Sequence, residues 1–143
     1  SDSGSDIIYR IINGVVEKWL SGKEIDHTNG ILVDGDKLLV GVNEDSSLKA
    51  VNIKDKSVTR LASMPSGAID GIKKCGKGYL VSHYEGNLYL VRQGGEVIEL
   101  LNTRAEKINC ADFEYIDKEN LLYIPALKNN KLFIYQYNCS NQP

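Results

Sequence analysis

The 143-residue chain has no long hydrophobic run, and its cysteines, histidines and prolines are few. No apolar stretch approaches the roughly 18 residues that a membrane-spanning helix requires, so no span is predicted. The cysteines contain no CxxC pair, which leaves a zinc knuckle or a thioredoxin-type motif without support. Seventeen basic and nineteen acidic residues are interspersed, and no basic stripe is present. Nucleic acid is therefore not predicted as a partner.

The chain also lacks the short motifs of several enzyme classes. It has no G-x-S-x-G, no P-loop and no G-x-G-x-x-G. Lys73, Lys74 and Lys77 form a local basic cluster, which is expected to be a solvated hairpin edge. The polar residues 1–6 are expected to be a disordered linker or remnant, and residues 140–143 a tail.

Three cysteines are an odd number, so at least one thiol is free or paired between chains. Cys110 has apolar neighbours and is expected to be a small buried hydrophobic side chain. Whether Cys139 forms a disulfide is left open by the sequence, and so is the redox compartment of the protein. The sequence predicts a soluble protein whose localisation is unknown, with a periplasmic or secreted location as one alternative.

A unit of about forty residues recurs along the chain. Asn29-Gly30-Ile31 is answered by Asp70-Gly71-Ile72, 41 positions later. Leu38 to Gly41 is answered by Tyr79 to Ser82, again after 41 positions, and then by Leu122 to Pro125. A self-similar unit of this length, made of short strands, is typical of a β-propeller blade.

The repeat predicts an all-β fold of four-stranded antiparallel blades. Strands are expected at residues 7–12, 15–20, 31–33, 38–42, 48–53, 58–61, 72–74, 79–83, 88–92, 97–101, 113–116, 121–124 and 132–137. With the strands of a blade lettered a to d from the ring axis outward, the chain reads c-d, a-b-c-d, a-b-c-d, a-b-c. Blade units start near residues 29, 70 and 111, within a partial propeller at 7–139.

This phase gives about three and a half blades, whereas propellers typically have four to eight. We expect the missing blades of a six-bladed ring to come from a longer chain or from a second copy. The first and last blades would otherwise expose flat apolar faces and unpaired strand edges.

Polar residues precede each predicted inner strand, at residues 27–30, 69–71 and 109–112. In a propeller these positions converge on one mouth of the central channel. The oxygens of Asn and Asp side chains suit a hard cation such as calcium. The same Asn-Gly and Asp-Gly pairs are also common turn signals that need no metal, and that alternative stays open.

These residues resemble the senescence-marker-protein/gluconolactonase (regucalcin-like) family of six-bladed propellers with a metal in the channel. Thr28-Asn29-Gly30-Ile31 matches one family motif. A second motif is matched by Asp70-Gly71-Ile72, Gly78 to Ser82 and Gly86 to Val91. The resemblance covers roughly residues 8–91. Family members usually have Pro before the Asp-Gly pair, and their glutamate ligand has no matching position here.

The resemblance implies a calcium-dependent lactonase-like hydrolase that acts on a small molecule. Asn29 and Asp70 would be metal ligands, and Asp70 would also be the general base that opens a lactone. His27, His83 and Asn109 are weaker candidates for substrate binding at the mouth. The alternative function is that of a non-catalytic propeller module that binds a protein, a glycan or a small ligand.

Overall fold

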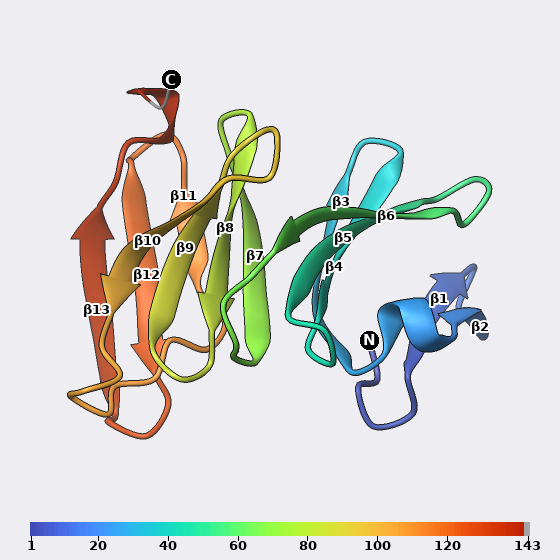
Figure 1. The fold of residues 1–143 in the computed structure, drawn as a ribbon, viewed down its shortest axis with the longest axis horizontal. Helices are drawn as coiled ribbons and strands as arrows, with labels where there is room; N and C mark the ends of the chain where they lie inside the picture. The colour runs from blue at the N-terminus through green and yellow to red at the C-terminus, as the bar shows by residue number, and fades with distance from the viewer. Residues whose placement is uncertain (142–143) are drawn as a thin grey trace.

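A computed structural model describes residues 1–141, and the last two residues of the predicted tail lie outside this range. Thirteen strands fall into four sheets that succeed one another along the long axis (Figure 1). The strands are β1 (Ile7–Ile12), β2 (Val15–Ser21), β3 (Thr28–Asp34), β4 (Lys37–Val42), β5 (Ser47–Asn52), β6 (Val58–Ser63), β7 (Ile69–Cys75), β8 (Gly78–His83), β9 (Asn87–Val91), β10 (Val97–Asn102), β11 (Glu114–Ile116), β12 (Leu121–Ala126) and β13 (Lys131–Gln136). Two single-turn 3₁₀ helices, Lys23–Ile25 and Cys139–Asn141, complete the structure.

The sheets have two, four, four and three strands, and each pairs its strands antiparallel in sequence order. This is the predicted phase of c-d, a-b-c-d, a-b-c-d, a-b-c, so the partial-propeller architecture is confirmed. Turn chemistry contributes to it. Asn13 and Gly14, for example, both have positive φ between β1 and β2, as a tight hairpin turn requires. Among the described residues there is no helix that is long and apolar enough to cross a membrane.

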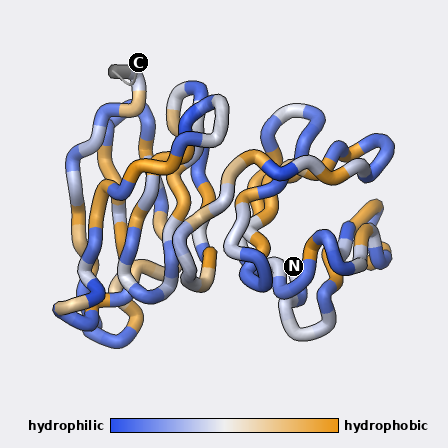
Figure 2. Tube along the Cα trace, in the orientation of Figure 1, coloured by the Kyte–Doolittle hydropathy of each residue, from blue (hydrophilic) through white to orange (hydrophobic). Residues whose placement is uncertain are grey.

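The core lies between the sheets, in three clusters. The middle strands of the two complete blades are buried along nearly their whole length, as sheets covered on both faces must be. Figure 2 shows that hydrophobic residues are concentrated along the strands of these sheets. The runs of apolar residues in β4 and β8, which point to both faces, thus reflect burial between blades.

The two outer sheets present apolar side chains to solvent. At the first sheet Ile11 is 69 % exposed and Val15 68 %, and at the last sheet Leu132 is 58 % exposed and Ile134 56 %. The outer edge of β13 pairs with no strand among residues 1–141. These are the surfaces that the blade phase predicts to be covered in a completed ring.

A disulfide joins Cys75, at the end of β7, to Cys139, just beyond β13. It ties the chain that leaves the last blade to the inner hairpin of the preceding one. The hydroxyl of Tyr115 reinforces this closure, because it donates to the carbonyl of Tyr137 and accepts from the amide of Cys139. Cys110 is a free thiol and is buried.

Residues 1–6 form turns in the structure, where composition predicts disorder. Asp2 forms an isolated bridge with Ile7, and the hydroxyl of Ser1 donates to the carbonyl of Asn29 at 2.6 Å. Asp6 accepts a hydrogen bond from the backbone amide of His27 at 2.9 Å. These contacts place the segment beside the start of β3.

Candidate functional site

The candidate site lies where the inner strands begin. The sequence places Asn29-Gly30 and Asp70-Gly71 just before the inner strands, but the structure places both pairs inside β3 and β7. In each strand the register to its neighbour shifts at that pair, between Thr28 and Ile31 and between Ile69 and Ile72. Such β-bulges redirect side chains from the regular alternation. The repeat therefore contains the same bulge twice.

The two glycines allow the inner strands to approach closely. A Cβ added to Gly30 would lie 2.2 Å from the backbone carbonyl oxygen of Asp70. A Cβ added to Gly71 would lie 2.8 Å from an oxygen of Asp112 and 2.8 Å from the ring of Phe113. Only a residue without a side chain fits such contacts. Each glycine thus brings its bulge against the next blade.

This approach places three oxygen-bearing side chains in a row, which we call the mouth row: Asn29, Asp70 and Asp112. Nδ2 of Asn29 donates to Oδ1 of Asp70 at 3.1 Å. Oδ1 of Asp112 accepts from the amide of Phe113 at 2.8 Å. The second oxygen of each carboxylate and the amide oxygen of Asn29 accept no hydrogen bond within residues 1–141.

The mouth row is rich in negative charge. Neither Asp70 nor Asp112 forms an ion pair with a described residue. The pKa of Asp70 is raised above its ordinary value, first by burial and then by the charge of Asp112, while the hydrogen bond from Asn29 acts in the opposite direction. A carboxylate whose charge is disfavoured by a neighbouring carboxylate is a place to which a cation is attracted.

Cys110 lies close to the mouth row but is no candidate nucleophile. Burial, with a contribution from the charge of Asp70, raises the pKa of its thiol to about 12. The thiol therefore stays protonated at neutral pH, and it is the thiolate that attacks substrates or binds metals.

The side chain of His27 lies beside acidic residues that do not belong to the mouth row. His27 has a positive φ of 51° and is exposed, and its Nδ1 lies 3.5 Å from both Asp26 and Glu44. Ligand atoms of Asp6, Asp26 and His27 lie within 4.8 Å of one another. The sequence gives no hint of this group, because Asp6 reaches it through the folded N-terminal segment.

His83 is completely buried at the end of β8, so it is not on the accessible mouth. Its ring meets that of Tyr89 edge to face, with 4.9 Å between the centroids. Neither ring nitrogen has a hydrogen-bond partner within residues 1–141, and burial lowers the pKa of His83 to about 4. Val42 holds the equivalent register position in the preceding blade. This is the position of a residue that packs between blades.

Asn109 is also nearly buried, and its Nδ2 donates to the carbonyl of Tyr84 at 3.0 Å. The bond fastens the segment that leads to β11 onto the turn after β8. Of the sequence-predicted site residues, the structure therefore brings together Asn29 and Asp70, and it joins Asp112 to them. His27, His83 and Asn109 each have contacts of their own and do not form a common group with one another.

No family model matches the chain, and neither does any curated protein. Among solved structures, virginiamycin B lyase from Staphylococcus aureus is similar over 94 % of this chain and 50 % of its own, with a TM-score of 0.64 and 9 % identity. The computationally designed Ika4 protein is similar over 87 % of this chain and 74 % of its own, with a TM-score of 0.60 and 10 % identity. The chain thus spans half the length of the lyase. The likeness to that β-propeller supports the fold and leaves the lactonase family unsupported.

Proposed function

We propose that the mouth row is this chain's share of a divalent-cation site in a propeller channel, and that the site serves hydrolysis of a lactone or ester. The observation that carries the proposal is the carboxylate of Asp70. It is partly buried, has a raised pKa, and lies between an amide and a second carboxylate with no basic partner among residues 1–141.

The donor set fits a hard cation in kind. Carboxylate and amide oxygens are the ligands that calcium prefers, and Asn29, Asp70 and Asp112 offer them from three successive blades. It does not complete such a site in number, because calcium takes six to eight oxygens. The remaining ligands would come from water and from the residues that complete the ring. Weak binding is therefore expected, with Kd on the order of 10⁻⁴ to 10⁻³ M.

The chemistry assigned to the protein's own residues is that of a positioned base. Asp70 takes a proton from the water that attacks the carbonyl carbon of the lactone, and that proton passes to the alkoxide that is released when the ring C–O bond breaks. Asn29 holds the carboxylate in place through its amide hydrogen bond. A bound divalent cation would supply polarisation of the lactone carbonyl.

The alternative is that the mouth row binds a cation and ligand without catalysis, since residues 1–141 offer only three such side chains in the row. Isothermal titration with Ca²⁺, Mg²⁺ and Zn²⁺ tests the cation site in both cases. The proposal expects Ca²⁺ binding that Asp70→Asn abolishes. Asp36→Asn makes the same charge change in a hairpin turn at the other end of the blade, and it should leave binding intact.

A pH-stat assay with an aliphatic δ-lactone separates the two functions. Hydrolysis that requires Ca²⁺ and Asp70 supports the enzyme. Binding of Ca²⁺ without hydrolysis supports the non-catalytic module. If neither Ca²⁺ nor the other ions bind, or if Asp70→Asn binds as well as the unmodified protein, the cation site is refuted.

A further inference from the structure

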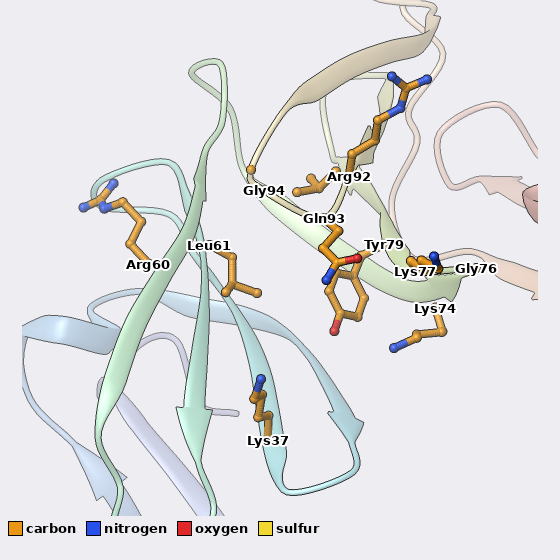
Figure 3. A pocket seen from close by; sticks show the side chains of 12 residues that line it. Lys37, Arg60, Leu61, Lys74, Gly76, Lys77, Tyr79, Arg92, Gln93 and Gly94 are labelled. Carbon is orange, nitrogen blue, oxygen red and sulfur yellow. The ribbon is translucent and has the colours of Figure 1, made fainter. Parts of the chain in front are cut away.

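A second feature lies at the opposite end of the blades from the mouth row. A cleft of about 840 Å³ runs between the β3–β6 sheet and the β7–β10 sheet, at their hairpin ends. Its walls come from the start of β4, the middle of β6, the β7–β8 turn and the β9–β10 turn (Figure 3). Asp70 is the second residue of β7 and Lys74 the last but one, so the two sites lie toward opposite ends of this strand.

The charged side chains that line this cleft, which we call the basic cleft, are all cationic: Lys37, Arg60, Lys74, Lys77 and Arg92. Three of them are partly neutralised by acids beside the cleft. Lys74 pairs with Asp34, Arg60 with Asp45 at 2.5 Å, and Arg92 with Glu96 at 3.0 Å.

Lys37 and Lys77 have no such partner. Neither forms an ion pair within residues 1–141. Lys37 is nevertheless close enough to Asp34 to contribute, after Lys74 and Tyr79, to the lowered pKa of that carboxyl group. The five cations of the cleft thus stand against three acidic ion-pair partners within residues 1–141, although the whole chain has a net charge of −2.

The centre of the cleft combines charge with an aromatic surface. In Figure 3 the ammonium groups of Lys37 and Lys74 and the phenol of Tyr79 point into the space between the sheets. Nζ of Lys74 lies 5.0 Å from the centroid of the Tyr79 ring, and the Tyr79 hydroxyl donates to Asp34 at 2.6 Å. The guanidinium groups of Arg60 and Arg92 point away from the centre, toward the rim.

Two glycines close one wall. Gly94 and Gly95, in the β9–β10 turn, both have positive φ. A Cβ added to Gly95 would lie 2.5 Å from the carbonyl oxygen of Leu61 in β6, so the turn rests directly on the neighbouring blade. A Cβ added to Gly94 would meet no atom of the described residues within 4 Å, so that side of the turn is open to the cleft's surroundings in this part of the chain.

We propose that the basic cleft binds a small organic ligand that carries a multiply charged oxyanion, in the form of phosphate or sulfate ester groups. Two ammonium groups that have no ion-pair partner within residues 1–141 call for at least two negative charges on the ligand, and lysine binds phosphate as a point charge. The volume lies in the range of about 300 to 1,000 Å³ that is usual for small-molecule pockets. The Tyr79 ring and the side chain of Leu61 offer contact to the uncharged part of the ligand.

Isothermal titration tests this with two probes, sodium tripolyphosphate and sucrose octasulfate, which distinguish phosphate from sulfate chemistry. At least one probe should bind. In a Lys37→Gln/Lys77→Gln variant the Kd should rise at least tenfold. Lys23→Gln/Lys131→Gln removes the same charge from exposed lysines outside the cleft and should change the Kd less than twofold.

Lys77→Gln alone should raise the Kd by less than the double variant does. It replaces the double variant in the test if circular dichroism shows that the double variant does not fold. Three outcomes overturn the proposal: neither probe binds at millimolar concentration, the cleft and control variants lose affinity equally, or neither variant loses any. An equal loss would indicate attraction to net charge rather than a site. Calcium titration of the cleft variant should match that of the unmodified protein, because the mouth row is untouched.

Discussion

Removal of the Cys75–Cys139 disulfide tests how the last blade is held. The bond joins residues that are 64 positions apart. In the chain-entropy model, closing a loop of that length lowers the entropy of the unfolded chain by roughly 14 cal/mol/K, which is about 4 kcal/mol at 25 °C. Both sulfurs belong to buried residues, so alanine avoids burying a hydroxyl. We expect Cys75→Ala/Cys139→Ala to lose about 4 kcal/mol of unfolding free energy.

Urea unfolding followed by circular dichroism measures this loss. With a slope of about 2 kcal/mol per molar urea, which is usual for a chain of this size, the midpoint should fall by about 2 M. A reducing agent should shift the unmodified protein by a similar amount and leave the double variant unchanged. Cys110→Ala, which keeps the disulfide, is the matched control. A midpoint shift below about 0.5 M in the double variant would refute the reasoning.

Two further predictions concern the blade contacts. Gly30→Ala should lower the free energy of unfolding by about 1 to 3 kcal/mol, because the new methyl group meets the backbone of Asp70. Gly4→Ala is the control and should be neutral, because the nearest atom to its new methyl group is 3.6 Å away. Equal urea midpoints for the two variants would contradict the close approach of the inner strands. The pKa of His83 is lowered to about 4 in the fold from an ordinary 6.5, so the unfolded state binds the proton first as pH falls, and up to about 3 kcal/mol of stability is lost between pH 6.5 and 4. His83→Val should remove this loss, and an unchanged pH profile of the urea midpoint would contradict it.

The fold was predictable because its signals are local and repeated. Apolar runs such as that of β4 are buried on both faces, and the turn glycines fall at the predicted hairpins. The forty-residue spacing gave the blade phase without any tertiary information. The spacing does not predict the bulge at Asn29-Gly30. Because of this bulge β3 begins at Thr28 rather than at Ile31, and the pairing with β4 decides the register.

The candidate site was predictable in part. Asn29 and Asp70 are one repeat apart, and equivalent positions of neighbouring inner strands meet. His83 misleads, because its place at a strand end suggests the mouth, while its side chain faces the preceding blade beside Tyr89. Asn109 misleads for a similar reason, since it is buried and its Nδ2 donates to the carbonyl of Tyr84.

The basic cleft and the disulfide were not predicted. Lys37, Lys77 and Arg92 are distant in sequence, and they meet because hairpin turns of adjacent blades share one end of the sheets. These cations could have been found from the sequence by comparing the charges at equivalent turns of successive blades instead of looking for clusters along the chain. The pairing of Cys75 with Cys139 depends on how the chain turns after β13, which the repeat does not specify.

The most direct test of the mouth row is an NMR titration of the side-chain carboxyl group of Asp70 with and without Ca²⁺. Without the ion, its pKa should lie above the ordinary value for aspartate, because of burial and the charge of Asp112. With Ca²⁺ its pKa should fall, because the ion favours the charged carboxylate. A carboxyl resonance that does not respond to Ca²⁺, with a pKa that stays where it was, would contradict the cation site.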